Sequence, residues 1–122
     1  MRDHTKLRAF ELADALALMV YRSTISFPGE EQFGLTSQMR RAAVSIASNI
    51  VEGCARTTQR DYLRFLDMAY GSAREVEYQA SLAHRLNYLN AKAYTSLRDH
   101  CAETSKVLGA LIRSLRTAGR RL

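Results

Sequence analysis

Proline, glycine and tryptophan are scarce in this sequence: 122 residues contain one Pro, six Gly and no Trp. Because Pro and Gly mark most turns and loops, their scarcity excludes a fold built from many short connections and indicates long regular segments. Only two cysteines occur, Cys54 and Cys101, and neither has the CxxC or Cys/His spacing of a zinc site. We therefore expect free thiols, no metal and no cofactor.

Long apolar runs and catalytic motifs are lacking as well. The longest apolar run, Ala15 to Tyr21, is far too short to cross a membrane, and the first seven residues are charged and polar. We expect a cytoplasmic protein without membrane contact. No phosphate-binding glycine loop, nucleophile elbow or Glu-x-x-His pair for a di-metal site occurs, so we expect no catalytic residue and no enzymatic activity.

Positive charge dominates what is present. Eighteen Lys and Arg residues face twelve Asp and Glu, a formal net charge of +6, and only three of the eighteen are Lys. Arg binds phosphate through two parallel hydrogen bonds and stacks on bases, so an excess of Arg favours a nucleic-acid partner. A GC-rich genome would produce the same composition without any ligand, and composition alone leaves both explanations open.

Apolar residues recur at three- and four-residue spacing along most of the chain, the pattern of amphipathic helices. The length suits a single domain over residues 1–122. We expect helices over about residues 4–24, 36–52, 58–89 and 91–117. Short links between long helices make neighbours antiparallel, so the sequence predicts an all-α, antiparallel up-and-down four-helix bundle.

Capping residues mark the expected helix ends. Thr36 or Ser37 is expected to cap the second helix, Thr58 the third and Asn90 the fourth, because such side chains accept hydrogen bonds from free backbone amides. Gly53 is expected to end the second helix in the left-handed conformation.

The third helix carries more apolar surface than one bundle needs. Its apolar residues cover more than half of its circumference between positions 62 and 70: Tyr62, Leu63, Phe65, Leu66, Met68, Ala69 and Tyr70. A narrower stripe suffices for a bundle helix, so the surplus predicts a homo-oligomer that buries it. The alternative is a monomer with scattered exposed apolar residues, which are common on protein surfaces.

Two basic groups are candidates for nucleic-acid binding. The first is Arg56, Arg60 and Arg64, spaced four residues apart; the second is Arg113, Arg116, Arg120 and Arg121. Asp67 is expected to relieve the charge of Arg64 only. Cations at a helix C-terminus also stabilise the helix dipole without any ligand, so the second group has a structural explanation too. An oligomer would multiply both groups and strengthen phosphate binding.

Polar residues inside the second and third helices invite a functional interpretation: Arg41, Asn49, Glu52, Ser72 and Glu75. We expect them to form a structural polar network between helices, because an unpaired buried charge costs about 3–5 kcal/mol. The alternative is an active site built on Asn49, Glu52 and Glu75.

The segment FGLTSQMRRAAVSIASNIVEG, residues 33–53, resembles the 23S rRNA-intervening sequence protein family. Further matches to the family pattern follow along the third helix, among them Phe65-Leu66, Gly71-Ser72, Glu75 and Tyr88-Leu89. The resemblance implies a four-helix bundle that assembles into a homopentameric ring. It also implies a distant similarity in shape to the accessory variability protein of diversity-generating retroelements, which partners a reverse transcriptase and RNA.

Together these features favour a non-catalytic, basic, ring-like homo-oligomer that associates with nucleic acid, with RNA favoured over DNA. A protein-interaction adaptor for a nucleic-acid-handling enzyme, such as a reverse transcriptase, is the second hypothesis. An enzyme that uses the polar cluster of the second and third helices is the third.

Overall fold

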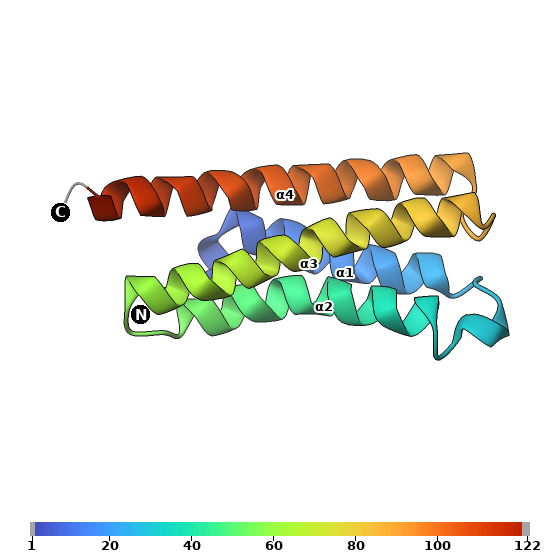
Figure 1. Ribbon diagram of the computed structural model, residues 1–122, viewed down its shortest axis with the longest axis horizontal. Helices are drawn as coiled ribbons and strands as arrows, with labels where there is room; N and C mark the ends of the chain where they lie inside the picture. Colours follow the sequence, from blue (N-terminus) through green and yellow to red (C-terminus); the bar gives the residue numbers. More distant parts are fainter. Residues whose placement is uncertain (1, 121–122) are drawn as a thin grey trace.

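The computed structural model describes the backbone of residues 2–120 and the side chains of residues 2–119. Four helices make up the fold: α1 (Arg8–Thr24), α2 (Leu35–Cys54), α3 (Gln59–Arg85) and α4 (Ala91–Arg120). Two short 3-10 turns precede α1 and α2, at His4–Lys6 and Gly29–Glu31. The helices run alternately up and down (Figure 1), which confirms the all-α four-helix bundle. No helix in the described range combines the length and the apolarity that a bilayer crossing requires.

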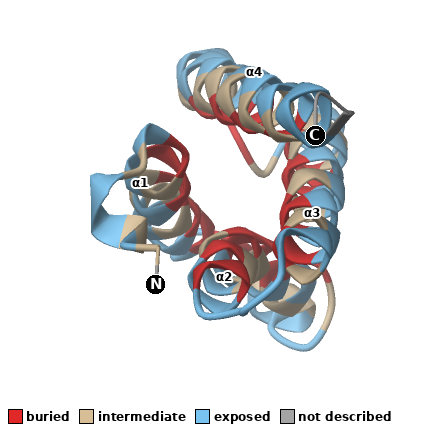
Figure 2. Ribbon diagram, turned by 90° about the vertical axis from the view of Figure 1, so that its left-hand side faces the viewer, coloured by how far each residue is buried: buried red, intermediate tan, exposed pale blue. Residues whose placement is uncertain are grey.

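Each helix packs against two neighbours, α1 and α3 each lying between α2 and α4. Viewed along the bundle, the buried faces of all four helices point to a shared centre (Figure 2). The expected apolar stripe of the third helix is fully buried there: Tyr62, Leu66, Ala69, Ala73, Val76, Ala80 and Ala83. Many of these residues are alanines, so the backbones of neighbouring helices approach closely.

Two expected caps are present. Thr58 Oγ1 accepts a hydrogen bond from the Asp61 amide at 3.1 Å, and Asn90 Oδ1 accepts one from the Ala93 amide at 2.8 Å. The third helix is shorter than expected, however, because it ends at Arg85. Asn87 takes a left-handed conformation, with φ of 64°, and the Tyr88 amide then bonds to the carbonyl of Ala83 at 2.8 Å. That geometry closes the helix four residues before the predicted end.

The expected cap of α2 was wrong, because the helix begins at Leu35, before Thr36 and Ser37. Glu31, in the preceding 3-10 turn, caps it instead: its Oε1 accepts from the Leu35 amide at 3.1 Å. Its Oε2 accepts from the Tyr88 hydroxyl at 2.8 Å. The Leu35 amide and, after it, the Tyr88 hydroxyl lower the pKa of Glu31 below its ordinary value.

The prediction for Gly53 was also wrong. The described glycines have no left-handed conformation, and α2 continues through Gly53 to Cys54. A methyl group on Gly53 would lie 3.0 Å from Cβ of Phe65 and 3.2 Å from Cδ1 of Tyr62. This glycine is required by the close approach of α3.

The wide apolar arc of α3 is largely buried within the chain itself. Tyr62, Phe65 and Leu66 are buried, and among the large apolar residues of the arc only Met68 is exposed, at 40%. The other large members of the arc, Leu63 and Tyr70, are partly buried against the same core. The arc is therefore not evidence for a second copy. Phe33 and Ile25, 91% and 76% exposed, are far less covered.

Candidate nucleic-acid interface

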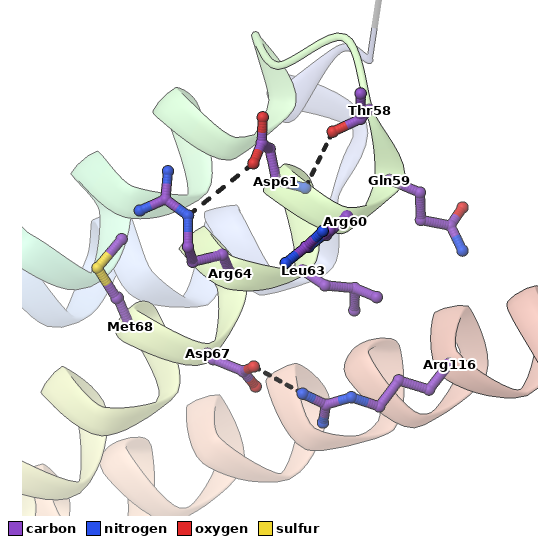
Figure 3. A pocket seen from close by; sticks show the side chains of 9 residues that line it. All are labelled: Thr58, Gln59, Arg60, Asp61, Leu63, Arg64, Asp67, Met68 and Arg116. Carbon is purple, nitrogen blue, oxygen red and sulfur yellow. Dashed lines mark hydrogen bonds and ion pairs between the residues drawn. The ribbon is translucent and has the colours of Figure 1, made fainter.

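The two basic groups, far apart in sequence, meet at one end of the bundle. The antiparallel packing of α3 and α4 sets the start of α3 beside the end of α4, where Gln59 Nε2 donates to the carbonyl of Leu115 at 3.0 Å. Arg60 and Arg64 of the first group and Arg116 of the second line one open hollow (Figure 3). The hollow is completed by Thr58, Gln59, Asp61, Leu63, Asp67 and Met68.

Two ion pairs balance part of this charge. Arg116 reaches from α4 to Asp67 on α3, with 2.6 Å between Nη2 and Oδ2, and Arg64 Nε lies 4.0 Å from Asp61 Oδ1 (Figure 3). The expectation that Asp67 relieves Arg64 was wrong, because Asp67 faces α4. Both pairs are about half exposed, so each contributes at most about 1 kcal/mol to stability. Arg60 has no carboxylate within 4 Å among the described residues.

Arg56 lies in the link between α2 and α3 and packs on an aromatic ring. Its guanidinium carbon is 4.5 Å from the ring centre of Phe65, and that of Arg64 is 4.7 Å from the same ring. Arg2 donates to the carbonyl of Arg56 at 2.8 Å and lies over Tyr62. These cation–π contacts give Arg56 and Arg64 a packing role besides any ligand role. Arg2 was missed because nothing local in the sequence links it to α3.

Arg113 lines a second open hollow, farther along the groove between α3 and α4. It shares this hollow with two cations that the sequence analysis did not single out, Arg74 and Lys106, and with Glu77. Each of these cations stands alone in its segment, so only the register of α3 against α4 could have revealed the group. Arg120 belongs to the last turn of α4, but its side chain, like all of Arg121, lies outside the described residues.

The two hollows together form the α3–α4 basic face. Six cations line it: Arg60, Arg64, Arg74, Lys106, Arg113 and Arg116. Three carboxylates accompany them: Asp61, Asp67 and Glu77. The excess of three positive charges lies on one surface that is open to solvent.

The expected polar network is only partly present. The hydroxyls of Ser45 and Ser72 lie 3.0 Å apart and join α2 to α3. Asn49 Nδ2 donates to the Ser45 carbonyl at 2.8 Å and to its Oγ at 3.0 Å. The structure therefore brings Asn49 and Ser72 together through Ser45, which the sequence analysis had not identified.

The charged members of that network do not bridge the helices. Arg41, Glu52 and Glu75 are exposed. Glu75 accepts one hydrogen bond, from Gln79 Nε2 at 3.4 Å, whereas Arg41 and Glu52 have no side-chain hydrogen bond or ion pair within the described part of the chain. These side chains keep their contact with water, so they carry no cost of an unpaired buried charge and need no partner on the neighbouring helix.

Arg41 and Glu75 line a small groove with Ser45 and Ser72, of about 200 Å³. Small-molecule sites usually measure about 300–1,000 Å³. The groove has no lining His to act as the base for Ser45 or Ser72. Of the three residues of the alternative active site, Glu75 lines this groove, whereas Asn49 and Glu52 do not.

The two helix histidines make structural contacts. His84 stacks on Tyr94 with ring centres 4.5 Å apart, and its Nδ1 lies 3.0 Å from the carbonyl of Leu89. His100 Nε2 lies 2.9 Å from the carbonyl of Leu12. Within residues 2–120, no three His, Cys, Asp or Glu side chains gather closely enough to hold a metal ion.

Comparison with known proteins identifies what this chain is similar to. A family model described as 23S rRNA-intervening sequence protein matches residues 5–110. A crystal structure from Bacteroides thetaiotaomicron, described as a protein with unknown function from the S23 ribosomal protein family, superposes with a TM-score of 0.78 at 24% sequence identity. The alignment covers 86% of this chain and 95% of that one, and at this identity it shows the shared fold. The comparison with curated proteins yields no match.

Proposed function

The chain belongs to the 23S rRNA-intervening sequence protein family, and we propose that it is a non-catalytic bundle that binds RNA through the α3–α4 basic face. The observation that carries this proposal is the convergence of Arg60 and Arg64 with Arg116 on one open hollow. Cations that gather from distant parts of a chain on one accessible surface attract a polyanion more strongly than the same cations spread evenly. The family is named for the intervening sequences of 23S rRNA genes, and we choose RNA over DNA on that link.

Binding of this kind is electrostatic and weakly selective. Exposed Arg side chains contact phosphates, and phosphate contacts position a protein on RNA without distinguishing one nucleotide sequence from another. Figure 3 shows the Arg side chains on helices, with no aromatic residue among those that line the hollow. Single-stranded RNA is read through aromatic platforms and base edges, which this hollow does not offer.

We extend the proposal to a cytoplasmic homo-oligomer, a ring of five copies, in which the basic face is repeated. The surface that a second copy would cover is an apolar patch made by the exposed side chains of Tyr21, Phe33 and Val44. They line an open hollow of about 540 Å³, whose edge also includes Arg40 and Arg41. Light scattering in moderate salt tests the assembly, since a monomer mass at tens of micromolar protein contradicts it.

Salt-dependent RNA binding tests the proposed function. We expect the log affinity for a single-stranded RNA oligonucleotide, measured by fluorescence anisotropy, to fall with log salt by about 0.7 per phosphate contacted. Replacing both Arg60 and Arg116 by Gln should flatten that slope by about 1.4, because two contacts are lost. Circular dichroism should show that the bundle remains folded, since both residues are exposed.

A matched control removes the same charge elsewhere. Arg22→Gln with Arg85→Gln changes two exposed Arg near the C-terminal ends of α1 and α3, away from the start of α3, and should leave the salt slope unchanged. If the control flattens the slope as much as the test variant, RNA responds to net charge and not to the α3–α4 basic face. If the wild-type protein binds no RNA at low salt, the proposal is wrong.

The adaptor hypothesis is the second candidate, and the apolar patch favours it. A Phe that is 91% exposed is an unusual surface residue and suits an anchor for a protein partner, such as a reverse transcriptase. Phe33→Ser distinguishes the two roles of the patch. For an adaptor, the substitution abolishes partner binding and leaves the light-scattering mass unchanged; for a ring interface, it lowers the mass.

A further inference from the structure

The second hollow of the basic face, of about 340 Å³, has an excess of cations at short range. Arg74, Lys106 and Arg113 line it together with Glu77. Glu77 pairs with Arg74 at 3.7 Å. Lys106 and Arg113 have no carboxylate within 4 Å among the described residues, so their charge is uncompensated.

Ser105, in the same hollow, carries a hydroxyl that lacks a partner. The residue is only 7% exposed, and its Oγ is buried without a hydrogen bond. The neighbouring Thr104 behaves as helix hydroxyls commonly do and donates to the carbonyl one turn back, that of His100, at 2.8 Å. Buried polar atoms without a partner are rare in folded proteins, and an anion that displaced the side chains covering Oγ would give this donor an acceptor.

Gly109 leaves room for the guanidinium of Arg113. A methyl group at position 109 would lie 3.2 Å from Nη1 of Arg113 and 3.7 Å from Cε2 of Tyr70. The Arg113 side chain is therefore folded back along α4 toward the preceding turn, as long helical side chains usually are. Because the glycine lacks a side chain, the guanidinium can occupy the hollow that Lys106 also lines.

We propose that Lys106, Arg113 and Ser105 bind one phosphate group in this hollow. The inference rests on the proposed RNA binding, of which the hollow would be a subsite for a backbone phosphate. Arg113 and Arg116 are three residues apart on one face of α4, so their Cα atoms are separated by about 4.5 Å along the helix axis. A single RNA strand can therefore contact both hollows.

A pair of glycine substitutions tests the subsite without removing any charge. Gly109→Ala obliges the Arg113 guanidinium to shift by a few tenths of an ångström, whereas Gly71→Ala, on α3 with nothing within 4 Å, changes only the backbone preference. Both variants should melt at or above the wild-type temperature, because Ala favours helix more than Gly does. We expect Gly109→Ala to weaken RNA binding severalfold, because the hydrogen bond from Arg113 to phosphate is distorted and not removed, and Gly71→Ala to leave it unchanged.

Ser105→Ala separates a ligand role from a structural one. Removing a buried hydroxyl without a partner should raise the melting temperature, because its desolvation penalty disappears. RNA affinity should nevertheless fall severalfold, as expected for a lost hydrogen bond to phosphate. Unchanged affinity in both Gly109→Ala and Ser105→Ala would overturn the subsite and leave the proposed function standing.

Inorganic phosphate distinguishes a subsite for RNA from a site for free phosphate. It is titrated into the wild type and both glycine variants while backbone amide NMR signals of residues 105–113 are followed. Phosphate-dependent shifts that need more phosphate in Gly109→Ala than in the wild type and Gly71→Ala, together with weakened RNA binding, support the subsite. If the shifts occur but the wild type binds no RNA, the site takes free phosphate and the proposed function fails. If neither ligand binds, both proposals are overturned.

Discussion

Replacing Gly53 by Ala tests how closely α2 and α3 approach. The new methyl group would lie 3.0 Å from Cβ of Phe65, 3.2 Å from Cδ1 of Tyr62 and 3.4 Å from the Tyr62 carbonyl oxygen. Carbon atoms in favourable contact are about 3.5–4.0 Å apart. Because a Cβ and a carbonyl oxygen are fixed to the backbone, α3 itself must shift, and a side-chain rotation cannot relieve the overlap.

Two opposing terms set the size of the effect. Overpacking a core costs about 1–3 kcal/mol. Replacing a helical Gly by Ala gains about 0.8–1.0 kcal/mol. We therefore expect Gly53→Ala to lower the free energy of unfolding by about 1 kcal/mol, and Gly71→Ala, which meets nothing within 4 Å, to raise it by up to about 1 kcal/mol.

Urea denaturation followed by far-UV circular dichroism measures both variants against the wild type. Their difference of about 2 kcal/mol exceeds the uncertainty of such curves, and the corresponding change in melting temperature is about 3–5 °C per kcal/mol for a domain of this size. A Gly53→Ala protein as stable as Gly71→Ala would refute the close packing of α2 on α3.

Two further predictions concern ionisable groups. Because the pKa of Glu31 is lowered in the folded state, its ionised form stabilises the fold at pH values above the ordinary pKa of 4.5. This stability is lost as the pH falls through the lowered pKa. Glu31→Gln should therefore flatten the pH dependence of urea unfolding in that acidic range. Burial raises the pKa of the Cys101 thiol to about 12, so a thiol reagent at mildly alkaline pH should label Cys101 only after denaturation, and rapid labelling of the native protein would contradict its burial.

The fold could be predicted because the spacing of apolar residues within each helix indicates which face of that helix is buried. Along α3 every residue of the expected stripe, from Tyr62 to Ala83, is buried, since a spacing of three and four residues places them on one side of a helix whatever surrounds it. The caps at Thr58 and Asn90 were predictable for the same reason, because both bonds span only three residues.

Features that depend on distant residues could not be predicted. Glu31 caps α2 while it also accepts from Tyr88, 57 residues away. Gly53 was expected to end α2, yet it lies within α2, where the close approach of Phe65 on α3 leaves no space for a side chain. Likewise, Asp67 has Arg64 three residues before it in sequence but pairs with Arg116, because the register of two helices decides which charge it meets.

The cations of the basic face differ in whether a distant residue already pairs with them. Antiparallel topology brings the start of α3 beside the end of α4, and the register of the two helices places Arg60 and Arg116 in one hollow. Register then pairs Arg116 with Asp67 at 2.6 Å and leaves Arg60 without a carboxylate within 4 Å among the described residues. A phosphate must compete with Asp67 for Arg116, whereas at Arg60 it displaces only water.

We therefore expect Arg60→Gln to weaken RNA binding more than Arg116→Gln in anisotropy titrations at one salt concentration. Asp67→Asn should strengthen binding, because it frees Arg116 and removes a negative charge. The reverse order of the two Arg variants, or weaker binding by Asp67→Asn, would show that Asp67 holds Arg116 in the orientation that RNA uses.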